Sequence, residues 1–170
     1  IDKINSIIFN RPVPYQVLLD KVNLILFQQI WRVLDRNGLA FEQFTSILDF
    51  GCGAGRFSHY FLKYAPAARV SGCEVVPRLV NKCRKLLPKG EFFHSKAAPP
   101  LDVPDHSFDL IYSYSVFTHL TESNHIAWLK EFARVLKPGG AMLLTTHSYE
   151  CLRRVALFSP ESLEKYQLGC

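Results

Sequence analysis

Long apolar runs are missing from this 170-residue sequence, and none approaches the length that a bilayer-spanning helix needs. The N-terminal stretch carries Asp2 and Lys3 early and shows no cleavage-site pattern, so it does not read as a secretory signal. These absences predict a cytoplasmic protein with no membrane partner. Because the first residue is Ile1 rather than Met, we also expect that a segment has been removed before it.

The spacing of the cysteines lacks any pattern typical of a disulfide framework or a zinc site. The odd count and the absence of any C-x-x-C pair argue against both. We therefore predict reduced thiols and no metal centre. Internal repeats and low-complexity segments are also missing. The five cysteines are Cys52, Cys73, Cys83, Cys151 and Cys170.

Strong charge of one sign is also lacking, since the formal net charge is only +5. Lysines and arginines are scattered, apart from a small group at Lys82, Arg84 and Lys85. Their spacing suits the solvated face of an amphipathic helix better than a nucleic-acid-binding patch. We expect no nucleic-acid partner. The length fits one domain with a sizeable core.

The most informative stretch is a strand, a glycine turn and a helix in direct succession. Residues 47–50 are mostly apolar, as in a buried strand, and Gly51, Gly53 and Gly55 follow. Phe57 and Phe61 then lie four apart, on one face of a helix. Such a corner in a doubly wound sheet binds nucleotide-like ligands, because glycines let a ligand approach bare backbone.

The spacing of this turn bears on which ligand it holds. The pattern is G-x-G-x-G, whereas a dinucleotide fingerprint reads G-x-G-x-x-G. Asp49 precedes the first glycine, and Glu74 follows at about the distance of a ribose-binding carboxylate. An acid beside the loop suits an ammonium group better than a pyrophosphate. An NAD-type oxidoreductase is therefore the weaker interpretation.

Four blocks along the chain resemble the class I S-adenosylmethionine-dependent methyltransferases. They stand in that family's order and separations and cover roughly residues 46 to 147. The resemblance implies a doubly wound, Rossmann-like, mostly parallel α/β sheet with helices on both faces, and S-adenosylmethionine as cofactor. The blocks are residues 49–55, 73–76, 107–113 and 132–140.

The resemblance also implies roles for particular residues. Gly51, Gly53 and Gly55 would face the methionine part of the cofactor, and Asp49 would take its ammonium group directly or through water. The alternative for Asp49 is a brace for the loop. Glu74 would accept both ribose hydroxyls. Its alternative is a solvated acid at a strand end.

The adenine side of the site is less marked in the sequence. Family members often carry an acid after the third strand, but no acid stands near Ala97. We expect the backbone around Ala97, with Val75 and Ser115, to contact the cofactor. Leu101 could also flank the ring, although Val75 and Leu101 could equally belong to the core. Asp102 would substitute for the missing acid only if its loop bends.

Two histidines fall where a general base could stand. His119 follows the fourth expected strand, and His147 follows the fifth. A histidine can remove a proton near neutral pH. The alternatives are a loop-orienting or water-holding role for His119 and a solvated loop position for His147. Methyl transfer also depends on positioning, because the sulfonium is already a good leaving group.

Alternating strand and helix patterns predict parallel βαβ units. We divide the chain into residues 1–45, an N-terminal arm and helical cap, and residues 46–170, the methyltransferase domain. After His147 no candidate remains for the family's two final strands, so we expect these to be missing or abbreviated. The predicted strands are 46–50, 69–74, 91–94, 108–115 and 141–146, and a long helix is predicted over 16–35.

The function predicted on these grounds is S-adenosylmethionine-dependent methyl transfer to a small-molecule acceptor. No Asn-Pro-Pro-Tyr-like segment follows the fourth strand, which argues against the amino-group methylases of DNA. The alternative is a noncatalytic, degenerate or truncated cofactor-binding module, which the missing strands and missing adenine acid would fit. The acceptor, its reacting atom and the oligomeric state stay open.

Overall fold

The structure, a computed structural model, describes residues 15–147 and divides the chain into two compact units, 1–43 and 44–170. The division lies near the predicted one between residues 45 and 46. The first unit contains helix α2 (Tyr15–Arg36) and the 3-10 helix η1 (Phe41–Gln43). The predicted lead-in arm, residues 1–14, lies outside the described residues.

Asn37 and Gly38 end helix α2. The Asn37 side-chain amide donates to the Val33 carbonyl at 2.7 Å, and Gly38 takes the left-handed conformation with φ +72°. This is a glycine C-cap. Within the same unit, the Phe41 ring centroid lies 4.8 Å from that of Trp31 and 5.7 Å from that of Phe27.

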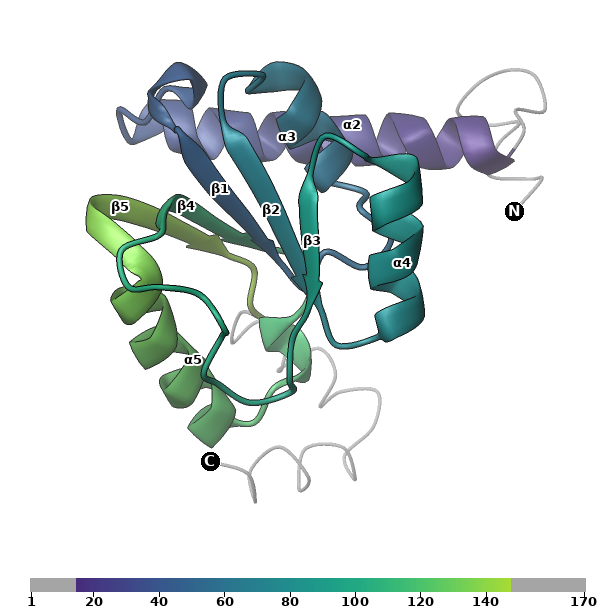
Figure 1. The fold of residues 1–170 in the computed structure, drawn as a ribbon. Coiled ribbons are helices and arrows are strands. Elements are labelled where there is room, and N and C mark those ends of the chain that lie inside the picture. The colour runs from purple at the N-terminus through teal and green to yellow at the C-terminus, as the bar shows by residue number, and fades with distance from the viewer. Residues whose placement is uncertain (1–14, 148–170) are drawn as a thin grey trace, which may run out of the picture. The chain divides into compact units, whose positions relative to one another are not determined.

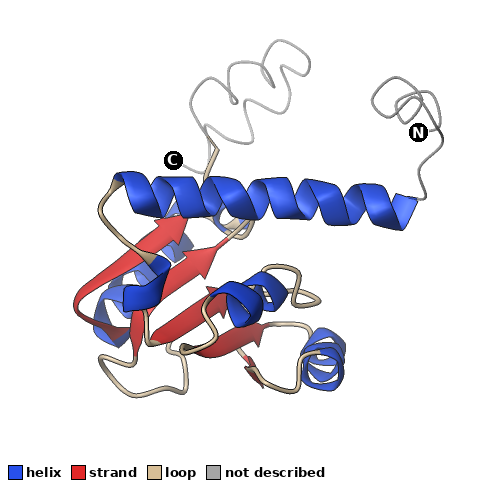
Figure 2. Cartoon of the chain, turned by 90° about the horizontal axis from the view of Figure 1, so that it is seen from above, coloured by secondary structure: helices blue, strands red, loops and turns tan. Residues whose placement is uncertain are grey.

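The second unit is built on a five-stranded parallel sheet in the order β3-β2-β1-β4-β5 (Figure 1). All five strands run in the same direction and twist progressively (Figure 2). The predicted doubly wound, Rossmann-like fold is confirmed. Its elements are β1 (Ser46–Phe50), α3 (Ser58–Tyr64), β2 (Arg69–Glu74), α4 (Pro77–Leu86), β3 (Glu91–His94), β4 (Phe108–Ser113), η2 (Phe117–His119), α5 (Glu122–Val135) and β5 (Leu136–Leu144).

The strand order reverses at the centre of the sheet. The chain moves outward from β1 through β2 to β3, then returns to place β4 on the other side of β1. Ile47 therefore pairs with Val70 of β2 and with Leu110 of β4. All five residues of β1 are buried. A ligand of such a sheet binds beyond the carboxyl ends of the strands, at this switch point.

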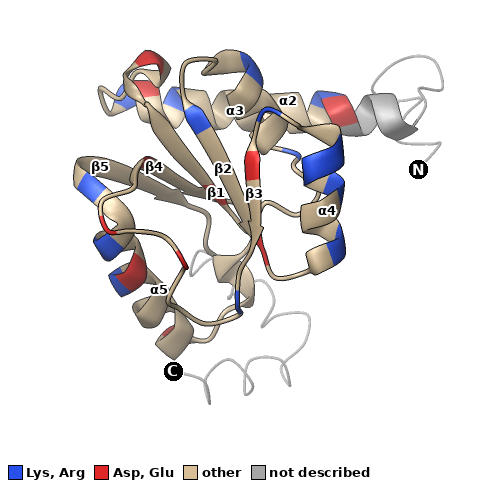
Figure 3. Ribbon diagram, in the orientation of Figure 1, with Lys and Arg blue, Asp and Glu red and all other residues tan. Residues whose placement is uncertain are grey.

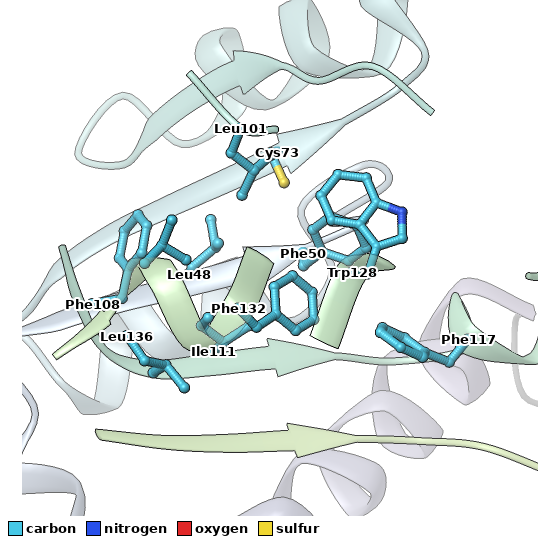
Figure 4. Close-up of a cluster of buried hydrophobic side chains, with 11 residues drawn as sticks. Leu48, Phe50, Cys73, Leu101, Phe108, Ile111, Phe117, Trp128, Phe132 and Leu136 are labelled. Atoms are coloured by element: carbon cyan, nitrogen blue, oxygen red, sulfur yellow. The ribbon is translucent and has the colours of Figure 1, made fainter. Parts of the chain in front are cut away.

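Neighbouring residues of β4 show how both faces of the sheet are covered. Ile111 belongs to a core cluster with Trp128 and Phe132 of α5, and the ring centroids of Phe50 and Trp128 lie 4.5 Å apart (Figure 4). Tyr112 points to the opposite face, because successive strand residues alternate. There its ring centroid lies 5.4 Å from that of Phe61 on α3.

Two strand bounds were predicted wrongly. The fifth strand begins at Leu136 rather than Ala141, because Leu136 already pairs with Phe108 across a register shift, so residues 137–140 lie within the strand. The fourth strand ends at Ser113 rather than Ser115, because Ser115 takes a left-handed conformation. Leu86 is 61% exposed at the end of α4. The prediction about final strands concerns residues that lie outside the described ones.

The basic group of the sequence lies on α4, and three cysteines of the second unit are buried. Lys and Arg lie along α4, which contains no acid (Figure 3). Cys52, Cys73 and Cys83 are buried and unpaired by disulfides, and burial raises the pKa of each thiol, that of Cys73 to about 12. Such thiols are inert packing groups. Within residues 15–147 no helix is long and apolar enough to cross a bilayer.

Candidate functional site

Two adjacent cavities open at the carboxyl ends of the strands, where the strand order reverses. The larger has a volume of about 330 Å³ and the smaller about 280 Å³. Gly51 and Tyr114 line both. The larger is otherwise lined by Phe50, Glu74, Val75, Ser95, Lys96, Ala97, Ser115, Val116, His119, Leu120 and Trp128. The smaller is otherwise lined by Asp49, Cys52, Gly53, Ala54, Arg56 and Phe57.

Asp49 is a buried acid in the lining of the smaller cavity. It is 2% exposed, and its Oδ2 accepts a 2.6 Å hydrogen bond from the hydroxyl of Ser58 at the start of α3. Burial raises its pKa from 3.8 to about 6, although hydrogen bonds from Ser58 and the positive charge of Arg56 oppose that rise. Asp49 thus braces the turn and borders the cavity at once.

Glu74 ends β2 and ties the glycine turn to the next loop. Its Oε2 accepts from the Gly53 N–H and its Oε1 from the Val76 N–H, each at 3.0 Å. The residue is 8% exposed and lines the larger cavity. A carboxylate has about four acceptor positions, so each oxygen keeps capacity for one further donor. Two hydroxyls on adjacent carbons fit that capacity.

The three glycines of the turn all have positive φ but serve different ends. A Cβ on Gly51, at φ +71°, would collide with the Val116 side chain. Gly53 lines the smaller cavity, and a Cβ there would enter open space. Gly55, predicted to face the cofactor, lines neither cavity. A Cβ on it would meet the Leu87 side chain at 2.6 Å, so its conformation lets the turn pack on α4.

The residues predicted on the adenine side separate into two groups. Val75, 49% exposed, and Ala97 both line the larger cavity. Leu101 is 4% exposed and belongs to the core cluster beneath α5 instead. Asp102 is exposed and lines neither cavity. The larger cavity contains one described acid, Glu74.

The loop after β4 is held to the end of β5. Ser115 takes the left-handed conformation with φ +59°, which is uncommon for a residue other than glycine. Its N–H donates to Thr145 Oγ1 at 2.7 Å, and the Thr145 N–H donates to the Ser113 carbonyl at 3.0 Å. Ser115 lines the larger cavity, so this pair of bonds shapes the cavity wall.

The two candidate histidines differ in position. His119 ends η2, is exposed and lines the larger cavity. The η2 turn is supported from α5, where His125 Nε2 lies 2.5 Å from the Phe117 carbonyl oxygen. His147 is exposed and borders neither of the two cavities.

Comparison with known proteins identifies the domain. A family model described as a methyltransferase domain matches residues 47–140, more than half of the chain. The chain belongs to this methyltransferase family. The predicted resemblance to class I S-adenosylmethionine-dependent methyltransferases is confirmed, and S-adenosylmethionine is the cofactor of this domain.

Individual curated relatives and solved structures are also similar to this chain. An uncharacterized methyltransferase of Schizosaccharomyces pombe is 33% identical over 123 residues, covering 66% of this chain and 41% of that protein. The 2-methyl-6-phytyl-1,4-hydroquinone methyltransferase of Synechocystis is 29% identical over 148 residues, covering 86% and 44%. The PH0226 protein of Pyrococcus horikoshii matches with a TM-score of 0.58 and 27% identity, covering 65% and 53%. The chain spans less than half the length of these two curated relatives.

The methyltransferase site fits its cofactor in two respects. The space beside Gly53 is one that any Cβ would partly fill, which explains a glycine where the cofactor approaches the backbone. Glu74 retains acceptor capacity in the larger cavity while its other bonds hold the turn. Both features suit a ligand with a ribose lying along the turn.

Sequence reasoning missed several residues of this site, chiefly Tyr114, Trp128 and Arg56. Tyr112 packs against Phe61 of α3. Tyr114 lies one residue past the end of β4 and lines both cavities. Its place beyond the carboxyl end of a strand at the switch point was the available signal.

Two further acids, Asp105 and Asp109, have structural roles. Asp109 lies near the start of β4, with Oδ1 2.7 Å from Lys137 Nζ and Oδ2 accepting from the Thr45 hydroxyl and the Ser46 N–H. Burial opposes ionisation of Asp109, but these bonds outweigh it and lower its pKa. Asp105 pairs with Arg134 at 2.6 Å. Neither acid lines a cavity described above.

Proposed function

We propose that this chain transfers a methyl group from S-adenosylmethionine to a small-molecule acceptor. One observation carries the proposal. Asp49 and Glu74 border two cavities that meet at Gly51 and Tyr114, at the carboxyl ends of β1 and β4. A ligand lying across both cavities would meet a carboxylate in each, which suits an amino-acid end and a ribose joined in one molecule.

The chain's own residues would bind and orient the reactants. When bound, S-adenosylmethionine supplies a methyl group on a positively charged sulfur. Glu74 accepts the ribose hydroxyls while it holds Gly53 in place, and Asp49 receives the ammonium group. Val75, Ala97 and Ser115 line the larger cavity, where the base would lie. Binding at fixed positions lowers the entropic part of the barrier to transfer.

His119 is the candidate general base, because it lines the larger cavity. A hydroxyl acceptor would donate its proton to this imidazole as the methyl group is transferred. His147 stays a weaker candidate on the loop after β5. Replacement of His119 by Ala should lower kcat for a hydroxyl acceptor while cofactor affinity stays within about threefold, if the residue acts only on the acceptor.

The small-molecule acceptor is supported by the size of the cavities and by the hydroquinone substrate in the name of the Synechocystis relative. We also propose a cytoplasmic location, where the three buried thiols stay reduced.

The test is methyl transfer from methyl-labelled S-adenosylmethionine to a panel of phenols, carboxylic acids and amines, with labelled product and S-adenosylhomocysteine both measured. Glu74→Gln should weaken cofactor binding about 30-fold, or about 2 kcal/mol, because an amide NH₂ would oppose one of two backbone donors. Glu91→Gln is the matched control, since Glu91 is exposed on β3 and pairs with Arg69. Equal effects of both variants would contradict the assignment of Glu74.

A noncatalytic module is the alternative outcome of the same assay. Cofactor binding without labelled product from any acceptor class, in the full-length protein, would favour it over methyl transfer. Production of S-adenosylhomocysteine in step with labelled product would exclude it.

A further inference from the structure

The smaller cavity is lined by one acidic and one basic residue, and each contacts different neighbours. Asp49 and Arg56 both line it. The Asp49 carboxylate is anchored by the hydroxyl of Ser58. In the described part of the chain no hydrogen bond or ion pair joins it to Arg56, although the two charges are close enough for the arginine to favour the ionised carboxyl.

The Arg56 guanidinium is positioned by two aromatic rings. Its Cζ lies 4.6 Å from the ring centroid of Phe57 and 5.2 Å from that of Tyr114. The two rings lie 5.0 Å apart, and Phe57 is anchored in turn against Tyr112 at 5.3 Å. Phe57 is 4% exposed, so it offers a rigid support. Cation–π contact of this kind orients a guanidinium without using its hydrogen-bond donors.

Those donors remain available at the cavity. Among residues 15–147, Arg56 has ring contacts but neither a hydrogen bond nor an ion pair. A guanidinium presents five N–H groups in a planar fork that matches a carboxylate. The negative charge of Asp49 would repel a ligand carboxylate. An anionic group in this cavity would therefore bind on the side of Arg56.

We propose that Arg56 binds the carboxylate of the cofactor's amino-acid end, so that Asp49 and Arg56 together hold an α-amino acid zwitterion. The inference rests on the proposed function, since it assumes S-adenosylmethionine in the two cavities. An α-amino acid carries its ammonium and carboxylate on one carbon, and this cavity offers one partner of each sign. Nicotinamide dinucleotides and simple nucleosides carry no such group.

The test compares ligands that differ only at the amino-acid end. S-adenosylhomocysteine carries both charges, decarboxylated S-adenosylhomocysteine lacks the carboxylate, deaminated S-adenosylhomocysteine lacks the ammonium, and 5′-methylthioadenosine lacks both, while the sulfur of all four is an uncharged thioether. Each is titrated calorimetrically into the wild-type chain and into Arg56→Gln, Arg56→Lys and Asp49→Asn. Lys82→Gln on α4 is the matched control, because it removes the same charge from a residue that lines neither cavity.

Arg56→Gln should weaken S-adenosylhomocysteine and its deaminated analogue about 10- to 100-fold, the loss of a charge-assisted hydrogen bond. It should leave the affinities for decarboxylated S-adenosylhomocysteine and 5′-methylthioadenosine within twofold of the wild type. Asp49→Asn should show the converse selectivity for the ammonium. Arg56→Lys should recover part of the affinity, which also shows that the site folds.

Equal weakening of all four ligands by Arg56→Gln would overturn the inference, because it would indicate damage to the fold. Unchanged binding of S-adenosylhomocysteine would also overturn it and would assign Arg56 to another ligand, such as an anionic acceptor. If the folded wild-type chain binds neither S-adenosylhomocysteine nor 5′-methylthioadenosine, the proposed function itself fails. The wild-type titrations thus separate that failure from failure of the Arg56 assignment.

Discussion

At the scale of single residues, the two acids of the site have different tasks despite their similar places at strand ends. Glu74 lines the larger cavity, and each of its carboxylate oxygens accepts one hydrogen bond from a backbone N–H. Asp49 is enclosed, and burial raises its pKa to about 6. Its ability to hold a cation therefore changes within an accessible pH range.

Cofactor affinity should depend on pH through Asp49. Because its pKa in the folded protein is raised above 3.8, the carboxyl is increasingly protonated as the pH falls below about 6 and then cannot hold an ammonium group. Affinity for S-adenosylhomocysteine should rise between pH 5 and pH 7 and level off above, by up to about tenfold per unit on the rising part. Calorimetry across this range measures it.

The control for that titration is Asp49→Asn, which cannot ionise. Its affinity should be weak and nearly independent of pH over the same interval. A wild-type affinity that stays constant from pH 5 to pH 7 would contradict a direct role for the ionised carboxylate. In the unliganded chain the sign is opposite, since a raised acid pKa favours the folded state at low pH and that contribution is lost as the pH rises through about 6.

At the scale of elements, the junction of β4 and β5 controls the wall of the larger cavity. Thr145 supports Ser115 in its left-handed conformation through a 2.7 Å hydrogen bond. Thr145→Val keeps the shape of the side chain but removes the acceptor. We expect cofactor affinity to fall roughly 5- to 10-fold, as expected for one lost hydrogen bond. Thr145→Ser should restore it. If Val and Ser variants bind alike, the hydroxyl does not hold the wall.

A second junction ties the loop before β4 to α5. Glu131 is 7% exposed and accepts the Leu101 N–H at 2.7 Å and Arg134 Nη2 at 2.6 Å, and the Arg134 hydrogen bond is the main reason its pKa is lowered. Arg134 also donates to the carbonyls of Leu101 and Val103. The network fixes a loop that would otherwise leave buried polar groups unpaired.

Glu131→Ala should lower the free energy of unfolding by about 2–4 kcal/mol, because it strips partners from a buried N–H and from an arginine. Urea denaturation measures it. Asp105→Asn removes an exposed partner of the same arginine and should cost less than about 1 kcal/mol. Similar losses in both variants would show that burial of Glu131 does not matter.

Strand positions could be predicted from the sequence because the buried parallel strands read as short apolar runs between glycine and proline. The bounds of β1, β2 and β3 agree with the prediction. The start of β5 could not be predicted, since Pro138 and Gly139 favour a turn. They belong to the strand because Leu136 before them and Ala141 after them both pair with β4 across a register shift. Exposure of Leu86 depends on where α4 ends against its neighbours, which local periodicity does not encode.

At the scale of the whole second unit, the site follows from topology more than from any motif. The strand order, which reverses between β1 and β4, brings residues from the ends of four strands, β1 to β4, around two adjoining cavities. Motif spacing singled out Asp49, Glu74, Gly51 and Gly53, which line these cavities, but also Gly55, which does not. Tyr114 and Arg56 were missed, because which way a side chain points at a strand end or turn depends on its packing partners.

The most direct test of this account is calorimetric titration of the chain with S-adenosylmethionine and S-adenosylhomocysteine, with NADH as the control ligand. We predict saturable binding of the first two at one site per chain, about 30-fold weaker binding in Glu74→Gln, and no binding of NADH. Binding of NADH in place of the other two, or no binding of S-adenosylhomocysteine to a folded sample, would contradict the assignment of these cavities.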